Sequence, residues 1–309
     1  MSESIVKVEQ LSHRYSVQWA IKDISFELKE KGIYGLLGAN GAGKSTIMNI
    51  MCGVLKQTKG NVYIRGYNLD THPVEAKKKI GFLPQMPPVQ PELTVEEYLT
   101  YCAHLRMIPK ADIPSAVKNV MELCNLSHFR KRLIKNLSGG YKQRAGIAQA
   151  IIHKPEFVIF DEPTNGLDPN QILEVRKLIK SIAEERTVIL STHILQEVQA
   201  LCEHIWMINE GQMIFSGPME DFDTYLQPSS LSVSLAQLPG LQYLTAIDGV
   251  VDAVHTGGID YTVNYAAGSR EVISRIVKSA VENNWELLHI SQNKNSLDNI
   301  FAELSKKKS

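Results

Sequence analysis

One stretch decides the fold of this 309-residue chain: Gly38-Ala39-Asn40-Gly41-Ala42-Gly43-Lys44-Ser45. It lies between an apolar run, Ile33 to Leu37, and a helical pattern, Lys44 to Leu55. Glycines at this spacing let backbone N–H groups curl around phosphate oxygens at the positive N-terminal end of the helix. A chance glycine-rich turn would account for neither the strand before it nor the helix after it. The stretch therefore predicts a phosphate-binding P-loop.

The P-loop supplies several contacts to a bound nucleotide. Lys44 brings a positive charge to the terminal phosphates, the Ser45 hydroxyl is a ligand for Mg²⁺, and Thr46 adds a phosphate contact. We therefore predict a nucleoside triphosphate with Mg²⁺ as the ligand. The predicted nucleotide-binding residues in this stretch are Asn40, Gly41, Ala42, Gly43, Lys44, Ser45 and Thr46.

Two carboxylates follow a second apolar run, Phe157 to Phe160. Ligands of parallel sheets bind at the carboxyl ends of the strands, so Asp161 and Glu162 should face the P-loop. Asp161 suits the Mg²⁺ shell, directly or through a water, and Glu162 suits a general base that polarises the attacking water. A solvated acidic cap is the alternative for such a strand end, and the P-loop upstream favours the catalytic interpretation.

A second anion site is predicted at Leu137-Ser138-Gly139-Gly140-Tyr141-Lys142-Gln143-Arg144. Ser138 is placed as an N-cap, the two glycines expose backbone N–H groups, and a helix follows through His153. One P-loop already satisfies one triphosphate, so we expect Ser138, Gly139 and Gly140 to complete the site of a second subunit. A plain serine-capped helix explains the serine but not the paired glycines.

Composition limits the possible functions. The 33 basic and 33 acidic residues give a formal net charge of zero, which argues against a nucleic-acid partner held by bulk charge. The four cysteines lack zinc-type or redox-pair spacing, which is typical of reduced thiols in the cytosol. No stretch approaches the roughly 20 apolar residues that span a bilayer, so another chain must supply any membrane part.

Hydrophobic patterns predict the organisation of the large nucleotide-binding domain, residues 1–226. Residues Ile5 to Leu28 predict antiparallel strands, and about residues 92–153 predict a helical subdomain that holds the second anion site. Thr94 with Glu97 predicts a capping box at the first of these helices.

Strand-loop-helix repetition predicts a parallel sheet with crossovers. The runs Phe157 to Phe160 and Thr187 to Ser191 each lead into a loop and a helix. The predicted fold is therefore α/β: a P-loop NTPase core with an antiparallel β subdomain and a helical subdomain.

A linker at 227–230 is expected to lead into a small accessory domain, residues 231–309. Its βαββαβ order predicts a ferredoxin-like α+β fold. The expected elements are strand Leu231–Leu235, helix Leu241–Ile247, a hairpin through Thr256-Gly257-Gly258, helix Arg270–Asn283, strand Glu286–Ile290 and a helix near Leu297–Leu304. The expected core residues are Val233, Val251, Val263, Ile273, Ile276, Val277 and Leu287.

With these motifs the chain resembles the ATP-binding subunit of an ABC transporter, over about residues 5 to 226. The resemblance implies that Tyr15 stacks on adenine, that Gln85 contacts Mg²⁺ and the attacking water, and that His193 touches the γ-phosphate. It also places Asp168 in the loop that links the two sites of a dimer. Asp168 suits a helix N-cap equally well, and that alternative stays open.

Two features indicate a branch of this family. Tyr141 stands where many members carry Gln, a change common in exporters. The ending from Ser296 to Leu304 resembles the close of the small C-terminal domain in drug-, antibiotic- and lipid-type exporters.

The resemblance implies an ATPase whose dimer closes on ATP and drives a separate integral membrane permease. The chain would lie in the cytoplasm, on the inner face of the cell membrane. Glu162, His193 and Gln85 would be catalytic, and Ser45, Gln85 and Asp161 would surround Mg²⁺. The alternatives are a soluble ABC ATPase acting on ribosomes or DNA, and a binding module without turnover.

Overall fold

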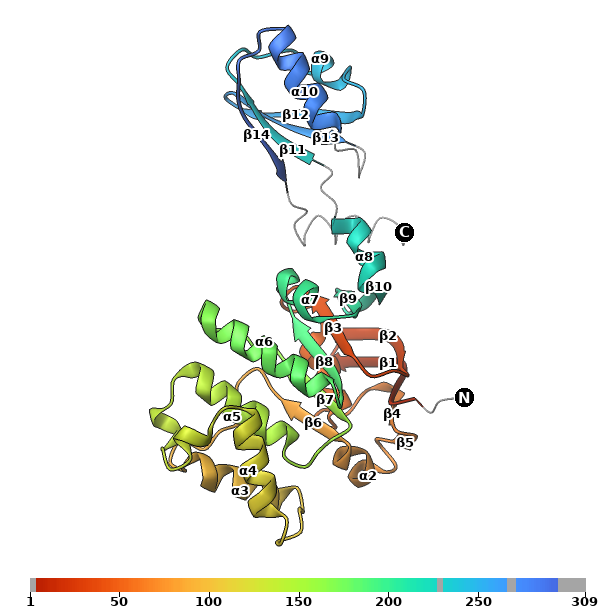
Figure 1. The fold of residues 1–309 in the computed structure, drawn as a ribbon. Coiled ribbons are helices and arrows are strands. Elements are labelled where there is room, and N and C mark those ends of the chain that lie inside the picture. Colours follow the sequence, from red (N-terminus) through yellow and green to blue (C-terminus); the bar gives the residue numbers. More distant parts are fainter. Residues whose placement is uncertain (1–3, 227–229, 266–270, 294–309) are drawn as a thin grey trace. The chain divides into compact units, whose positions relative to one another are not determined.

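The computed structural model of the chain describes residues 4–226, 230–265 and 271–293 (Figure 1). It contains two compact units, Met1–Met219 and Glu220–Ser309. The division lies a few residues before the linker expected from the sequence.

A six-stranded sheet forms the centre of the first unit, with strand order β10-β9-β3-β8-β7-β6. All neighbours pair in parallel except β10, which runs antiparallel to β9. Every residue of β3, β7 and β8 is buried, as expected for parallel strands covered on both faces. The strands are β3 (Ile33–Gly38), β6 (Ile80–Leu83), β7 (Phe157–Asp161), β8 (Thr187–Thr192), β9 (His204–Asn209) and β10 (Gln212–Pro218).

The parallel topology brings four strand ends to one edge of this sheet. The P-loop follows β3, the segment with Gln85 follows β6, Glu162 follows β7, and His193 follows β8. Residues far apart in the chain therefore meet there.

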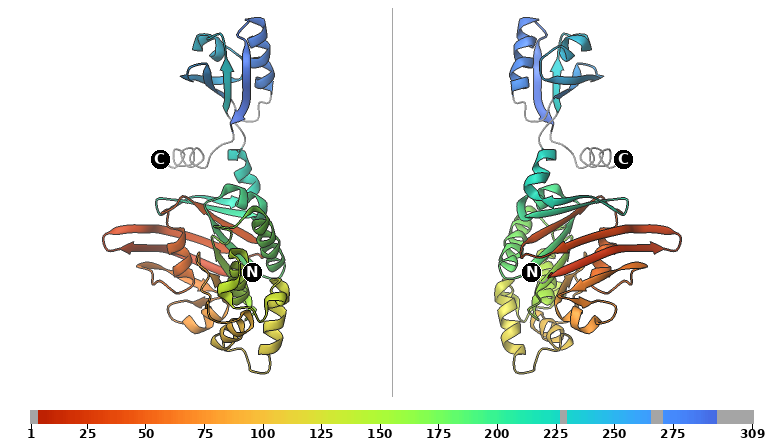
Figure 2. Two further views of the ribbon diagram at one scale, coloured as in Figure 1. Left: turned by 90° about the vertical axis from the view of Figure 1, so that its left-hand side faces the viewer. Right: turned by 90° about the vertical axis from the view of Figure 1, so that its right-hand side faces the viewer.

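An antiparallel sheet with order β2-β1-β4-β5 is the second layer of this unit. It confirms the antiparallel region predicted from Ile5 to Leu28, because β1 and β2 pair from Val6↔Leu28 to Tyr15↔Gln18. Figures 1 and 2 show the β1–β2 hairpin and helix α6 on opposite sides of the six-stranded sheet. The strands are β1 (Val6–Tyr15), β2 (Gln18–Leu28), β4 (Lys59–Ile64) and β5 (Tyr67–Asn68).

Helices α3, α4 and α5 gather into the predicted helical subdomain (Figure 1). The capping box at the start of α3 is confirmed: the Thr94 side chain accepts from the Glu97 N–H, and the Glu97 carboxylate accepts from the Thr94 N–H. The helices of the first unit are α1 (Lys44–Met51), α2 (Pro73–Lys78), α3 (Val95–Leu105), α4 (Ile113–Leu123), the 3₁₀ turns η1 (Ser127–Phe129) and η2 (Ile134–Asn136), α5 (Gly139–Ile151), α6 (Pro169–Ala183) and α7 (Leu195–Leu201).

The second unit has the predicted βαββαβ order and a sheet of order β12-β13-β11-β14. Its own apolar core contains Leu231, Val263 and Ile276, each fully buried. Its elements are β11 (Ser230–Leu235), α9 (Leu241–Thr245), β12 (Val250–Gly257), β13 (Asp260–Tyr265), α10 (Glu271–Glu282) and β14 (Leu287–Asn293), and α8 (Met219–Leu226) spans the division between the units.

Some details differ from the sequence prediction. Helix α1 ends at Met51 and not Leu55, because Gly53 adopts a positive φ that ends a helix. Val251 is not a core residue but 71% exposed, because a register shift after Val250 turns its side chain out of the β12 alternation. The helix expected near Leu297–Leu304 lies outside the described residues.

Candidate active site

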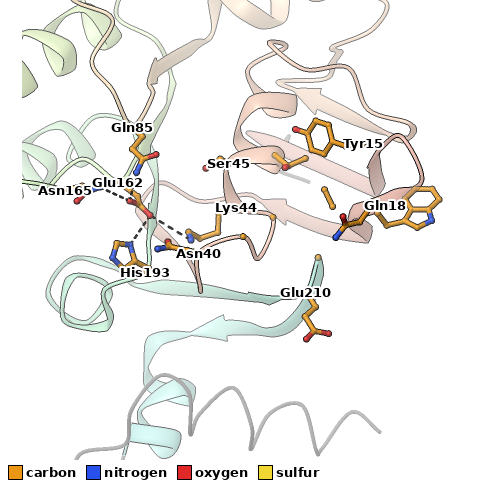
Figure 3. A pocket seen from close by; sticks show the side chains of 16 residues that line it. Tyr15, Gln18, Asn40, Lys44, Ser45, Gln85, Glu162, Asn165, His193 and Glu210 are labelled. Atoms are coloured by element: carbon orange, nitrogen blue, oxygen red, sulfur yellow. Dashed lines mark hydrogen bonds and ion pairs between the residues drawn. The ribbon is translucent and has the colours of Figure 1, made fainter.

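A pocket of about 980 Å³ opens at the edge of the sheet where the four strand ends meet (Figure 3). Its lining unites the P-loop with the ends of β6, β7 and β8 and with the β1–β2 hairpin. The lining residues are Tyr15, Gln18, Trp19, Ala20, Asn40, Gly41, Gly43, Lys44, Ser45, Thr46, Gln85, Glu162, Asn165, His193, Glu210 and Gly211.

The P-loop leads directly into α1. Gly43 has a φ of 109°, and a Cβ there would lie 2.7 Å from Ile21 Cγ2 and 2.8 Å from the Ala20 carbonyl oxygen. Only glycine fits both the backbone conformation and the space, so the glycine fixes the turn that starts the helix.

Lys44 lines the pocket and is only 5% exposed. Its Nζ donates to the carbonyl oxygens of Gly38 (2.9 Å) and Ala39 (3.1 Å) and lies 4.0 Å from Glu162 Oε1. Burial lowers the pKa of Lys44 below its ordinary value, and the carboxylates of Glu162 and Asp161 offset part of that effect. Its charge is thus oriented toward the pocket within a polar cage.

Glu162 is the centre of the hydrogen-bond network shown in Figure 3. Its Oε2 accepts from Gln85 Nε2 (3.0 Å) and Asn165 Nδ2 (3.2 Å), and its Oε1 accepts from His193 Nδ1 (3.0 Å). Its backbone is left-handed, with a φ of 47°, and its N–H donates to the Ser191 carbonyl oxygen. A buried carboxylate held in this way can accept a proton from a water in the pocket.

His193 presents its second ring nitrogen to other partners. A carboxylate only accepts, so Nδ1 carries the proton that is donated to Glu162, and Nε2 is left for a ligand. This geometry follows from the position of His193 directly after β8.

Asp161 directly precedes Glu162, at the end of β7, and is buried. Its Oδ1 accepts no hydrogen bond from the described part of the chain. A buried carboxylate oxygen without a donor fits a cation or a cation-bound water. In the described ranges no cluster of three His, Cys, Asp or Glu side chains could hold a metal alone. A cation here would need ligands from a nucleotide as well, which suits Mg²⁺.

Tyr15 lies at the opposite end of the pocket and is 54% exposed. Its ring meets His13 edge to face, with centroids 4.7 Å apart. An exposed ring at a pocket rim is available for stacking on a planar base.

Three comparisons with known proteins identify this arrangement. The sequence profile described as ABC transporter matches residues 21–165, and one described as AAA domain, putative AbiEii toxin, Type IV TA system matches residues 134–198. The chain is 34% identical over 307 residues to the bacitracin transport ATP-binding protein BcrA of Bacillus licheniformis, a match covering 97% of each chain. The chain belongs to the ABC transporter family.

Further matches agree with this assignment. The linearmycin resistance ATP-binding protein LnrL of Bacillus subtilis (strain 168) is 31% identical over 308 residues, covering 97% of this chain and 98% of that one. A dimeric post-hydrolysis structure of the ATP-binding cassette MJ0796 with ADP and Pi matches with a TM-score of 0.63 and 26% identity, covering 69% of this chain and 98% of that one. This ABC protein is therefore an ATP-binding subunit and an ATPase. The names of these relatives do not support the alternative of a soluble ABC ATPase that acts on ribosomes or DNA.

Several predicted residues of this ABC ATPase do not line the pocket: Ala42, Ser138, Gly139, Gly140, Asp161 and Asp168. Ser138 stands at the N-cap of α5 but its side chain makes no capping hydrogen bond, and it is exposed. Asp168 does cap a helix, because its Oδ1 accepts from the Gln171 N–H at 2.9 Å. The capping alternative for Asp168 is thus realised, and its role in linking sites stays a prediction.

Sequence reasoning missed part of the ABC pocket. Gln18 pairs with Tyr15 across the β1–β2 hairpin. Prediction of this hairpin register would have placed Gln18 beside Tyr15 in the pocket. Gly211 donates to the Ala42 carbonyl oxygen at 3.0 Å, and no local pattern links this turn to the P-loop.

Proposed function

We propose that this ATPase is the energy-supplying subunit of an exporter and drives a separate membrane permease. BcrA is named for transport of bacitracin and LnrL for resistance to linearmycin. Resistance is served by moving a compound out of the cell, so the name of LnrL supports export and that of BcrA supports transport. No helix in the described residues is long and apolar enough to cross a membrane. A partner permease would supply the membrane path and hold this subunit at the inner face of the cell membrane.

The observation that carries the catalytic part is the convergence of Lys44, Gln85 and His193 on Glu162. Tyr15 would stack on adenine, and residues 40–46 would hold the phosphates. Glu162 would take a proton from a water as the water oxygen attacks the γ-phosphorus and the bond to the ADP oxygen breaks.

Mg²⁺ fits Asp161 Oδ1, which accepts no hydrogen bond from the described residues, together with the Ser45 hydroxyl and the Gln85 amide. When bound, it would neutralise charge on the phosphate oxygens. The His193 Nε2 would contact the γ-phosphate while Nδ1 stays bonded to Glu162.

A second subunit would complete each site. Ser138 and Gly139 are exposed at the N-terminus of α5 and outside the pocket of their own chain. Backbone N–H groups at such a terminus bind anions. They would therefore cover the nucleotide of a partner, and Asp168 would lie in the loop between the two sites.

The accessory domain, residues 231–309, would steady this dimer. Its sheet and helices enclose a core of their own, and its described residues do not line the nucleotide pocket. A spacer and a docking surface for another protein are the alternatives.

Replacing Glu162 by Gln tests the function. The amide oxygen can accept from Gln85 and Asn165, and the amide nitrogen can donate to His193 Nδ1 once that ring carries its proton on Nε2, so the site keeps its shape and loses its base. We expect steady-state turnover to fall by about a hundredfold or more with ATP binding retained. The closed dimer should accumulate and be seen by gel filtration with MgATP.

Glu210→Gln is the matched control, because Glu210 is another carboxylate that lines the pocket. It should leave turnover unchanged. Turnover of Glu162→Gln close to that of the parent would refute the assignment of the base.

A further inference from the structure

Glu197, in the first turn of α7, is a carboxylate outside the nucleotide pocket that is 1% exposed. Both of its oxygens are bound by hydroxyl groups. Thr164 Oγ1 donates to Oε1, and Thr192 Oγ1 donates to Oε2 at 2.9 Å. The two threonines come from different segments: Thr164 lies in the loop after β7, and Thr192 is the last residue of β8.

The Thr164 hydroxyl connects Glu197 to the loop that binds Glu162 Oε2. Thr164 directly precedes Asn165, whose Nδ2 donates to Glu162 Oε2 at 3.2 Å. The Asn165 N–H also donates to the Glu162 carbonyl oxygen at 3.1 Å, which closes the turn. The hydrogen bond from Thr164 therefore ties this turn to Glu197.

The Thr192 hydroxyl connects Glu197 to the segment that binds Glu162 Oε1. Thr192 directly precedes His193, whose Nδ1 donates to Glu162 Oε1 at 3.0 Å. Thr192 Oγ1 also accepts from the Ile194 N–H at 3.0 Å, so one hydroxyl holds the backbone on both sides of the histidine. Its own proton goes to Glu197.

We propose that Glu197 is a positioning residue for Glu162, an inference that rests on the proposed role of Glu162 as the base. One buried carboxylate joins the two loops whose side chains, Asn165 and His193, hold the two oxygens of Glu162. Release of either loop would let Glu162 move relative to the attacking water. Among the described residues, none of the P-loop residues 38–46 makes a hydrogen bond to the Glu197 side chain, so the hold of the P-loop on ATP should depend little on this network.

A purely structural role leads to a different expectation. Burying a carboxylate costs free energy unless hydrogen bonds compensate for the lost hydration. Removing the donors therefore lowers the free energy of unfolding, whether or not the carboxylate has a role in catalysis. Such a loss reduces the fraction of folded molecules and leaves the rate of each folded molecule unchanged. Only positioning alters the rate per ATP-binding molecule.

The test compares three Thr→Val substitutions, which keep the side-chain shape and remove one hydroxyl. Thr164→Val and Thr192→Val each remove a donor to Glu197. Thr187→Val is the matched control, because Thr187 is also fully buried in β8 and its Oγ1 has no hydrogen-bond partner among the described residues.

Rates are normalised to the fraction of molecules that bind ATP, so loss of folded protein is not counted as loss of rate. We expect kcat to fall by about tenfold or more for Thr164→Val and Thr192→Val, with the Kd for ATP unchanged within about twofold. Thr187→Val should keep the parent kcat. A parent kcat in both test variants, or an affinity loss that accounts for the whole effect, overturns the proposal.

A double-substitution cycle with Glu162→Gln shows whether the effect passes through Glu162. In that background, single-turnover hydrolysis should be slow, and adding Thr192→Val should change it by less than about twofold. A full tenfold further loss would mean that Thr192 acts independently of Glu162 and would overturn the proposal. If Glu162→Gln alone turns over at the parent rate, the assignment of the base has failed, which is a separate result.

Discussion

Gly139→Ala separates contacts within one chain from contacts between two chains. Gly139 is the first residue of α5 and is exposed. Among the residues that the structure describes, a Cβ at this position would meet only Leu167 Cδ2, at 3.9 Å, which is ordinary van der Waals contact. Alanine in place of glycine in a helix stabilises by up to about 1 kcal/mol, and less at the first position. We therefore expect the free energy of unfolding to rise by about 0.5 kcal/mol.

The same methyl group should damage activity. In the proposed dimer the Gly139 N–H approaches the nucleotide of the partner, at the roughly 3 Å of a hydrogen bond. A methyl group on that surface keeps the phosphate away from the N–H. Loss of one preorganised donor costs about a hundredfold in rate in other active sites. We expect kcat to fall by at least about tenfold and the MgATP-dependent dimer to be lost.

The assays are thermal unfolding, steady-state phosphate release, and gel filtration in the Glu162→Gln background, where the closed dimer accumulates. Gly240→Ala is the matched control: Gly240 is the N-cap of α9 in the second unit, and of the described side chains an added Cβ there would meet only Gln242, at 3.7 Å. The control should leave activity unchanged. A Gly139→Ala protein that is stable and fully active would refute the composite site.

Three further expectations follow from the site and the fold. Lys44→Ala subunits mixed with Ser138→Arg subunits should regain part of the ATPase activity that each lacks, since one site of a mixed dimer keeps both intact residues; a mixture no faster than its components would contradict shared sites. Truncation after residue 228 should preserve single-turnover hydrolysis and weaken dimerisation without nucleotide, measured by sedimentation, and equal association of the two proteins would exclude the steadying role. His153 Nε2 donates to the Ile80 carbonyl oxygen at 3.0 Å, and burial lowers its pKa to about 4. The unfolded chain, with a histidine pKa of about 6.5, binds more protons, so the free energy of unfolding should fall as pH drops from about 6.5 to about 4, by up to ~3 kcal/mol; His153→Gln should flatten that part of the denaturation profile.

Local patterns were enough to predict much of the fold. The P-loop, the apolar strand before Asp161, and the capping box at Thr94 each depend on residues within a few positions of one another. The βαββαβ order of the second unit was also correct, because its strands alternate clearly. The short or partly polar strands β4, β5, β6, β9 and β10 were not predicted, since they gain their strand structure from pairing with distant neighbours.

The residues of the candidate site also fall into two groups, those that a local sequence motif predicts and those that it does not. Lys44 and Glu162 follow from motifs, whereas the positions of Gln85 and His193 rested on resemblance to a family. No sequence pattern predicts the hydrogen bonds from Thr164 and Thr192 to Glu197. Thr164 lies 33 positions before Glu197 and Thr192 lies 5 positions before it, and the side chains meet only when the fold has formed. Contacts of this kind can be recognised only in three dimensions.

This division has a kinetic consequence. Most of the proposed phosphate-binding residues, 40–46, lie in one continuous segment, so we expect their contacts to persist when neighbouring elements shift. The contacts around Glu162 come from three separate strand ends, and one of them, the 3.0 Å bond from Gln85, starts in the segment that leads into the helical subdomain. A displacement of that subdomain would therefore change the orientation of Glu162 before it changes the hold on the nucleotide. We therefore expect the rate of hydrolysis to respond to the position of the helical subdomain while ATP stays bound.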